Sequence, residues 1–229
     1  MSEPALSITK QALSGLAALA IVLWLVLFMP AWTLNYWQAW IYWLVFVACV
    51  TAISVYFIKK DPKLIEKRVK AGPGSENDMI QKVIQTIVAI FFILLLLIPS
   101  LDHHFQWSKV PAYVSITSYV FVVLGLLIVF LVFNANSFAS ATIEVDKEQR
   151  VISTGAYGVV RHPMYSGALL MLLFTPLALG SFWGLLAFPP ILATIAVRLV
   201  EEEKFLSKKL NGYTEYCQKV KYRLIPYVW

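Results

Sequence analysis

Uncharged apolar runs, several of them close to the length of a membrane-spanning helix, dominate this sequence. Of the 229 residues, 59% are hydrophobic and only 14% are charged, against roughly 25% charged residues in soluble domains. A helix needs about 20 apolar residues to cross the hydrocarbon core of a bilayer. Six segments reach or approach this length: about 12–29, 37–58, 80–99, 110–133, 164–179 and 182–197. We therefore predict an all-α integral membrane protein with about six transmembrane helices and little mass outside the membrane.

The last two apolar segments are joined only by Gly180 and Ser181. So short a joint forces the two arms to run antiparallel, as a helical hairpin. Both arms are short and contain prolines, at 176 and at 189–190, which predicts kinks or a locally thin membrane site.

Apolar residues of the C-terminal tail recur at spacings of three and four, with lysines on the other faces, which is typical of an amphipathic helix. These apolar residues are Leu206, Leu210, Tyr213, Cys217 and Val220. We expect this helix to fold back on the membrane surface and cover the mouth of the hairpin, a plain interfacial anchor being the alternative. The basic loop 59–79 likewise favours a short interfacial helix, followed by a Gly-Pro-Gly turn.

Basic residues are distributed unevenly between the two sides of the predicted bundle. With six crossings and a cytoplasmic N-terminus, 18 of the 19 lysines and arginines fall on the cytoplasmic side, and only Lys109 falls on the other. The positive-inside rule then places both termini in the cytoplasm. We expect a membrane of the bacterial inner-membrane type or an equivalent one. Topology and anionic lipid account for the net charge of +6, so no nucleic-acid partner is expected.

Charged side chains gather at both ends of the hairpin. Arg161 and His162 precede its first arm, and Arg198 and the glutamates 201–203 follow its second. An antiparallel hairpin returns both groups to one membrane face, where charge at the edge of hydrocarbon predicts a functional site. Snorkelling side chains and salt bridges between the hairpin ends are the alternative. Three consecutive glutamates argue against it, because they repel one another and contribute nothing to topology.

The start of the first arm is suited to an anion. Pro163 can occupy the first helical turn, where a missing N–H has no cost, and Gly155 and Gly158 permit close backbone approach. Free N–H groups at such a helix start favour a carboxylate or a phosphate.

No metal site or disulfide framework is expected. Cys49 lies in an apolar run and Cys217 in the tail, and two cysteines so placed define neither. His103 and His104 follow Asp102 without a further ligand nearby.

The stretch "TGAYGVVRHPMYSG" (154–167) resembles the RHPxY element of membrane methyltransferases that use S-adenosyl-L-methionine. That group includes the isoprenylcysteine carboxyl methyltransferases and the phosphatidylethanolamine N-methyltransferases. The tail is similar to their pattern of an arginine, a Glu-Glu pair, a leucine, Tyr-x-x-Tyr and Ile-Pro. Here these residues are Arg198, Glu202, Glu203, Leu206, Tyr213, Tyr216, Ile225 and Pro226. The resemblance begins near Asn134, includes "NSFAS" (136–140), and departs at Ala156, where many members have proline. It divides the chain into N-terminal transmembrane helices, 1–133, and a methyltransferase core, 134–229.

The resemblance implies S-adenosyl-L-methionine as the cofactor, held without a metal in a pocket on the cytoplasmic side. It implies that Arg161 and Arg198 bind carboxylates of cofactor or substrate, and that Asn136 lies near the acceptor. The glutamates 202 and 203 would hold the amino group or the ribose hydroxyls of the cofactor. The cofactor-binding residues implied are Tyr157, His162, Pro163, Tyr165, Gly167, Glu202 and Glu203.

The implied reaction transfers a methyl group to a hydrophobic small-molecule or lipid acceptor, either an isoprenylcysteine-like carboxylate or a phospholipid amine. Two alternatives stay open. Membrane C=C reductases of the sterol type carry a similar Arg-His-Pro-x-Tyr element and use NADPH, but they are generally longer. A transporter or scaffold is disfavoured because no inverted repeat and no mid-membrane charge is found. The sequence predicts neither the oligomeric state nor the base that an amine acceptor would require.

Overall fold

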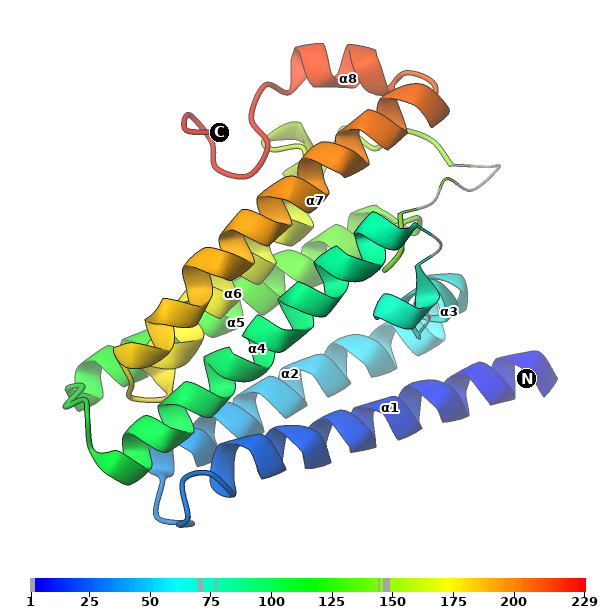
Figure 1. The fold of residues 1–229 in the computed structure, drawn as a ribbon. Coiled ribbons are helices and arrows are strands. Elements are labelled where there is room, and N and C mark those ends of the chain that lie inside the picture. Colours follow the sequence, from blue (N-terminus) through cyan, green and yellow to red (C-terminus); the bar gives the residue numbers. More distant parts are fainter. Residues whose placement is uncertain (1–2, 70–71, 77, 144, 146–148) are drawn as a thin grey trace.

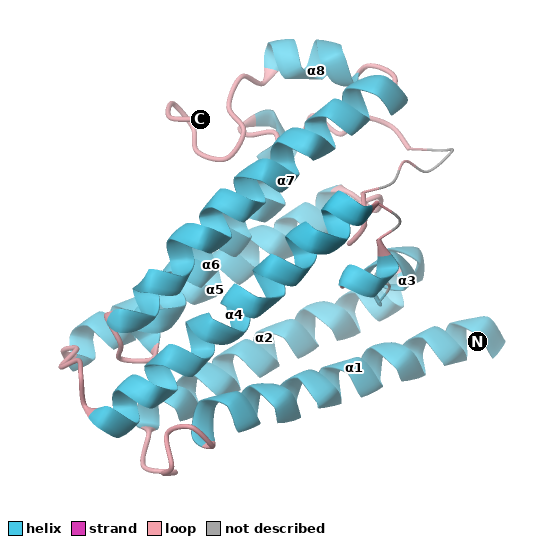
Figure 2. Ribbon diagram, viewed as in Figure 1, coloured by secondary structure: helices cyan, strands magenta, loops and turns pink. Residues whose placement is uncertain are grey.

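The computed structural model describes residues 3–69, 72–76, 78–143, 145 and 149–229. Long helices lie roughly along one axis, and α8 caps one end of the bundle (Figure 1). The α-helices are α1 (Glu3–Phe28), α2 (Trp37–Lys60), α3 (Pro62–Val69), α4 (Met79–Phe105), α5 (Ala112–Ala135), α6 (Pro163–Ala178), α7 (Phe188–Lys209) and α8 (Tyr213–Lys219). Short 3₁₀ segments are η1 (Pro73–Ser75), η2 (Gly155–Gly158) and η3 (Trp183–Ala187). No β-strand occurs in the described part of the chain (Figure 2).

Five helical segments are long and apolar enough to cross a membrane. They are Ile8–Phe28, Trp37–Lys60, Met79–Phe105, Ala112–Ala135 and Trp183–Lys209. The sixth apolar helix, α6, has only 16 residues, or about 24 Å, which is less than the roughly 30 Å of hydrocarbon. The predicted all-α integral membrane fold is confirmed, with five helices of full length and one shorter helix.

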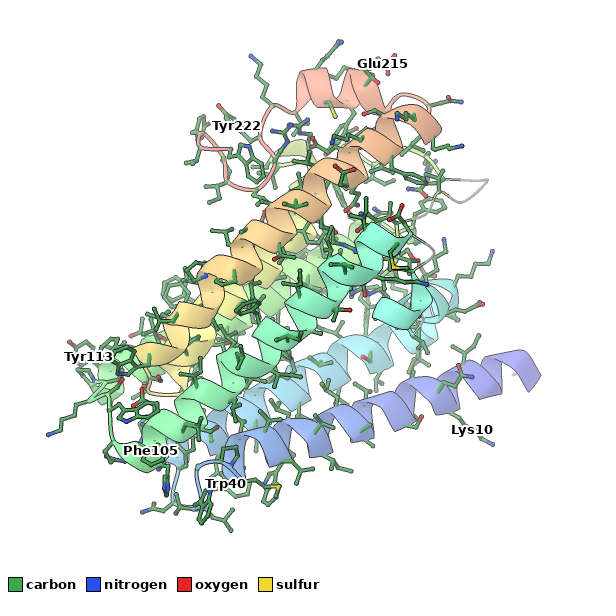
Figure 3. All side chains as sticks on the ribbon, in the orientation of Figure 1. Lys10, Trp40, Phe105, Tyr113, Glu215 and Tyr222 are labelled. Atoms are coloured by element: carbon green, nitrogen blue, oxygen red, sulfur yellow. The ribbon has the colours of Figure 1, made fainter. Side chains whose placement is uncertain are left out.

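The two ends of the bundle differ in chemistry. Trp40, Phe105 and Tyr113 lie at the end that carries the α1–α2 and α4–α5 loops (Figure 3). Lys10 and Glu215 lie toward the opposite end. The charged end agrees with the predicted uneven distribution of basic residues between the two sides of the bundle. Which end faces the cytoplasm remains a prediction from the lysine and arginine count.

The predicted hairpin is formed by α6 and α7, with η3 between them. Gly180 adopts φ +77°, and the Ser181 N–H donates to the carbonyl of Pro176 at 2.9 Å, which closes the turn. The second arm begins as a 3₁₀ segment, and Pro189 and Pro190 fall in the first turn of α7. These two prolines therefore start the helix, where no N–H is needed, and do not kink it.

A buried carboxylate holds the hairpin turn. Asp102 of α4 is 1% exposed and accepts hydrogen bonds from Ser108 N and Oγ, each at 2.6 Å, and from Ser181 Oγ. Its neighbour His103 stacks on the ring of Tyr36, with 4.0 Å between the centroids. In this structure the Asp-His-His triplet therefore joins α4, the loop after it and the hairpin turn.

Helices α5 and α6 approach each other at a pair of glycines. A Cβ added to Gly125 would lie 2.5 Å from the carbonyl oxygen of Gly167, and one added to Gly167 would lie 2.8 Å from the carbonyl oxygen of Gly125. Only glycine permits backbones to come this close. This contact sets the position of α6, and with it the position of the RHPxY loop at its start.

The amphipathic tail is confirmed as a packed stripe, but it is broken into two helices. Leu210, Tyr213 and Val220 are buried in one cluster, against which Leu206 and Cys217 pack. Helix α7 ends at Lys209, Gly212 turns the chain at φ +82°, and α8 follows. The turn lets α8 cross over the end of the bundle instead of continuing along α7 (Figure 1).

The basic loop forms α3, whose Leu64 and Ile65 are buried where α3 packs on α1 and α2. The predicted Gly-Pro-Gly turn contains η1. Residues 70–71 and 77 of this loop lie outside the described residues.

Candidate functional site

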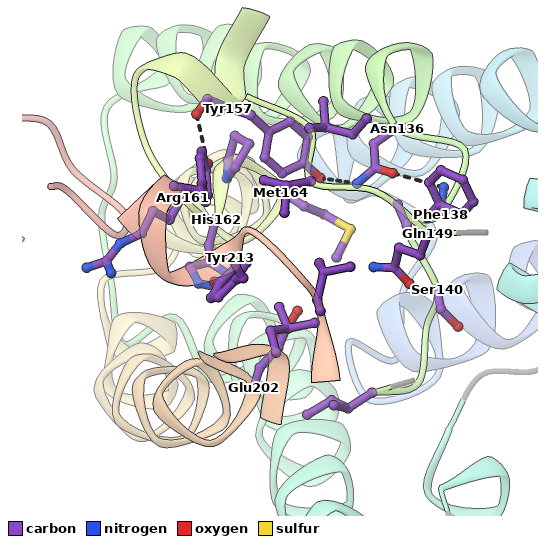
Figure 4. Close-up of a pocket in the computed structure, with 18 of the residues that line it drawn as sticks. Asn136, Phe138, Ser140, Gln149, Tyr157, Arg161, His162, Met164, Glu202 and Tyr213 are labelled. Carbon is purple, nitrogen blue, oxygen red and sulfur yellow. Dashed lines mark hydrogen bonds between the residues drawn. The ribbon is translucent and has the colours of Figure 1, made fainter. Parts of the chain in front are cut away.

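A cavity opens where the RHPxY loop, the end of α7 and the roof formed by α8 meet (Figure 4). It encloses about 800 Å³, counting the space open to solvent at its mouth. Its walls come from residues within 136–143, 149–152, 157–165 and 202–216. The two ends of the hairpin meet here, since His162 Nε2 lies 3.2 Å from Glu203 Oε1. The predicted convergence of both hairpin ends on one site is therefore present in the structure.

The RHPxY loop is held by the C-terminal tail. The N–H groups of Arg161 and His162 donate to the carbonyls of Tyr222 and Arg223, each at 2.9 Å. Ser166 Oγ donates to the carbonyl of Leu224 at 2.6 Å. The expectation that free N–H groups at this loop face a ligand is thus wrong for residues 161 and 162, because the tail uses both.

Glu203 is surrounded by two arginines and a histidine of the protein. Its Oε1 lies 3.2 Å from His162 Nε2 and 3.2 Å from Arg161 Nε, and its Oε2 accepts from Arg223 Nε at 2.9 Å. The Arg161 Nε–H is not aligned for a hydrogen bond, so that contact is electrostatic. Glu203 is 8% exposed, and it does not line the cavity. The structure places it in an ion cluster that ties together the RHPxY loop, α7 and the tail.

Glu202, one residue earlier, does line the cavity. Its Oε2 accepts from the Tyr165 hydroxyl at 2.7 Å, and among the described residues it forms no ion pair. The Tyr165 oxygen in turn accepts from Arg198 Nε at 3.1 Å. Glu202 is therefore held in place by a neutral hydroxyl, and no described cation pairs with it.

Arg198 does not line the cavity. Its guanidinium is 8% exposed and donates to Glu76 Oε1 at 2.8 Å, Gln81 Oε1 at 3.0 Å and the Ala141 carbonyl at 3.1 Å. The resemblance implied that this arginine binds a carboxylate of the cofactor or substrate. In the structure, the carboxylate that it binds is that of Glu76, a residue of the protein. Glu76 and Gln81 were missed by sequence reasoning because no motif marks them.

A second hydrogen-bonded group lies on the opposite wall. Asn136 Nδ2 donates to the Tyr157 hydroxyl at 2.9 Å, and Asn136 Oδ1 accepts from the N–H of Phe138 at 2.9 Å (Figure 4). The Tyr157 carbonyl accepts from the Tyr216 hydroxyl at 2.8 Å. Burial raises the pKa of the Tyr157 phenol, and the hydrogen bond from Asn136 opposes this shift only in part. The phenol is therefore protonated at neutral pH.

Of the remaining predicted residues, Arg161, His162 and Pro163 line the cavity and Gly167 does not. Gly167 lies one turn further along α6, in the glycine contact with α5. Residues not assigned a role from sequence also line the cavity: Met164, Gln149, Arg150 and Tyr213. Tyr213 is 5% exposed, and its hydroxyl has no hydrogen-bond partner among the described residues. Its place in the Tyr-x-x-Tyr pattern was the one signal that could have found it.

The fold and cavity define a helical membrane protein with a polar, aromatic-walled pocket at one end of a transmembrane hairpin. Residues 113–211 match the model of the phospholipid methyltransferase family, which confirms the resemblance predicted from the sequence. The matched range contains the RHPxY loop, the hairpin and the Glu-Glu pair. Delta(14)-sterol reductase TM7SF2 of Mus musculus is 34% identical over 93 residues, which cover 38% of this chain and 22% of that protein. The chain thus spans about a fifth of the length of this curated relative.

Proposed function

We propose that this protein is an S-adenosyl-L-methionine-dependent methyltransferase of the membrane. In this proposal the cofactor binds in the cavity, at the cytoplasmic face, and the acceptor is a hydrophobic or lipid-type molecule. The observation that carries the proposal is the Glu202 carboxylate, which lines an aromatic cavity without an ion pair among the described residues. The family match over residues 113–211 supports it.

The residues of the cavity fit the chemistry of this cofactor. S-adenosyl-L-methionine carries an ammonium, two ribose hydroxyls, a carboxylate and a sulfonium. Glu202 offers an acceptor for the ammonium or the hydroxyls, and Arg150 offers donors for the carboxylate. The rings of Tyr157 and Tyr165 offer π-faces, which attract a cation such as the sulfonium.

When bound, the cofactor would supply an electrophilic methyl group for in-line displacement. Positioning then accounts for most of the catalysis, because alignment of two bound reactants converts a bimolecular step into a unimolecular one. Tyr165 fixes the Glu202 carboxylate, and Asn136 fixes the Tyr157 hydroxyl, so two walls of the cavity present polar groups in set directions. Tyr213 and Tyr216 of the roof exclude water, which strengthens the electrostatic interactions beneath them.

The two proposed acceptor classes differ in whether the acceptor must lose a proton. A carboxylate or thiolate acceptor needs no base, whereas an amine acceptor must release a proton. His162 Nε2 is already engaged by Glu203 at 3.2 Å. A phospholipid amine and an isoprenylcysteine-like carboxylate both fit a cavity at the membrane edge, where a hydrophobic acceptor arrives from the bilayer and the cofactor from water.

The test is equilibrium binding of radiolabelled S-adenosyl-L-methionine to purified protein, with two matched variants. Glu202→Gln removes the charge in the cavity while keeping the shape, and we expect the dissociation constant to rise about tenfold or more. Glu201→Gln makes the same change one residue away, on an exposed side chain paired with Lys204 at 2.7 Å, and should leave binding unchanged. Equal effects of the two variants, or no binding by the wild type, would contradict the proposal. Mass spectrometry after incubation of membranes with a deuteromethyl cofactor would then identify the acceptor.

A second candidate is an NADPH-dependent reductase of sterol-type C=C bonds. It is favoured by the 34% identity to a sterol reductase over 93 residues. Arg150 at the cavity would suit the phosphates of NADPH, whereas the charge of Glu202 would repel them. NADPH oxidation with a sterol that carries a conjugated double bond, together with the absence of S-adenosyl-L-methionine binding, would favour this candidate.

A further inference from the structure

A continuous chain of hydrogen bonds links the α3–α4 loop to the cavity wall. Glu76 accepts from Arg198, Arg198 donates to Tyr165, and Tyr165 donates to Glu202, at 2.8, 3.1 and 2.7 Å. Glu76, the first member of this hydrogen-bond network, is 4% exposed. It lies outside residues 113–211, the range that matches the family. Glu202, the last member of the network, lines the cavity.

The guanidinium of Arg198 is held on three sides by groups of the protein. Beyond Glu76 and Tyr165, it donates to Gln81 Oε1 and to the Ala141 carbonyl. An arginine has five N–H donors in a rigid plane, so these partners fix one orientation. Its charge therefore lies against Glu76, two hydrogen bonds away from Glu202.

The network connects Arg198 to two carboxylates. Glu76 is its ion partner, whereas Glu202 is reached only through the Tyr165 hydroxyl. A buried arginine without an opposite charge is costly, so loss of the Glu76 charge would draw the guanidinium toward Glu202. The Tyr165 hydroxyl, which carries a single proton, lies between them. A direct Arg198–Glu202 pair would neutralise the carboxylate that a cationic ligand requires.

We propose that Glu76 is a positioning residue, which retains Arg198 and thereby keeps the Glu202 carboxylate free for the cationic part of the ligand. The inference rests on the proposed function, because it takes the ligand of Glu202 to be S-adenosyl-L-methionine. It assigns a role in the site to the α3–α4 loop, a segment that the family match does not cover.

The experiment is equilibrium binding of S-adenosyl-L-methionine to the full-length chain, analysed for the number of sites and the dissociation constant separately. Misfolding lowers the number of sites, whereas misplacement of Glu202 raises the dissociation constant of the molecules that remain folded. For Glu76→Gln we expect a dissociation constant about tenfold higher with the number of sites preserved. The control is Asp78→Ala, which removes the N-cap of α4 that accepts from Ile80 N at 2.7 Å. Among the described residues, Asp78 makes no hydrogen bond to the network from Glu76 to Glu202. It should lower thermal stability and leave the dissociation constant unchanged.

The double variant Glu76→Gln/Arg198→Met separates competition from general damage. With the arginine gone, nothing in this network pairs with Glu202, so the dissociation constant should return toward the wild-type value. Binding as weak as in the single variant, or a single variant that binds like wild type, would overturn the inference. If the wild type binds NADPH and not S-adenosyl-L-methionine, the proposed function fails. The series is then measured with NADPH, where an unchanged dissociation constant in Glu76→Gln overturns the inference as well. A wild type that binds neither probe refutes both.

Discussion

The glycine contact between α5 and α6 makes a prediction that separates packing from ligand binding. In Gly167→Ala, the new Cβ would lie 2.8 Å from the Gly125 carbonyl oxygen and 2.9 Å from Ile128 Cβ and Cγ2. To reach an ordinary contact of 3.4 Å, the helices must separate by 3.4 minus 2.8, or about 0.6 Å, and a backbone oxygen cannot rotate aside. Overpacking of this kind costs about 1–3 kcal/mol. The helix preference for alanine returns roughly 1 kcal/mol, so we expect a net loss of up to about 2 kcal/mol.

The assay is reversible unfolding of the purified protein in mixed micelles, followed by circular dichroism. Gly15→Ala is the matched control, since it makes the same change inside α1 with no atom within 4 Å of the new Cβ. This control should be about 1 kcal/mol more stable than the wild type. Because Gly167 does not line the cavity, the folded fraction of Gly167→Ala should bind cofactor normally. Unchanged stability combined with weakened cofactor binding would refute this reasoning and support the cofactor role that the resemblance implies.

Three further predictions concern buried polar groups. Glu203→Gln leaves its cationic partners without their counter-charge and should destabilise the protein by about 3–5 kcal/mol; an unchanged unfolding midpoint would show that the ion cluster is dispensable. Tyr216→Phe loses one hydrogen bond and should cost about 0.5–1.5 kcal/mol, whereas Tyr213→Phe removes a hydroxyl without a described partner and should cost nothing. An equal cost in denaturant unfolding of the two variants would mean that the Tyr213 hydroxyl has a partner. Asp102→Ala removes the acceptor of the Ser181 hydroxyl proton at the hairpin turn and should cost about 1–3 kcal/mol, with faster proteolysis at that turn as the independent measurement.

The fold was predictable because a bilayer leaves few choices. A segment without charge must satisfy its own backbone in lipid, so each long apolar run becomes a helix. The two-residue joint at Gly180 then fixed the hairpin, and its antiparallel course brought His162 to Glu203. The break between α7 and α8 was harder to predict from the sequence. The apolar spacing from Leu206 to Val220 is that of one continuous helix, and only Gly212 interrupts it.

The roles of individual side chains in the site were predictable only in part. Neighbours on a helix point about 100° apart, so Glu202 and Glu203 face different surroundings, and the sequence does not specify the rotation of α7 that decides which one lines the cavity. The same holds for Gly167, which faces α5. Arg198 finds its ion partner 122 residues away in Glu76, a tertiary pairing that no local pattern encodes.

The hold of the tail on the RHPxY loop has a consequence for biosynthesis. Ser166 and Leu224, which bond to each other, are 58 residues apart, and both arms of the hairpin lie between them. All of the membrane helices are therefore translated before the tail segment that fastens residues 161 and 162. A chain cut after residue 219 would keep these helices, yet its RHPxY loop would lack the carbonyls of residues 222–224 that hold it, so we expect ligand binding to require this tail segment.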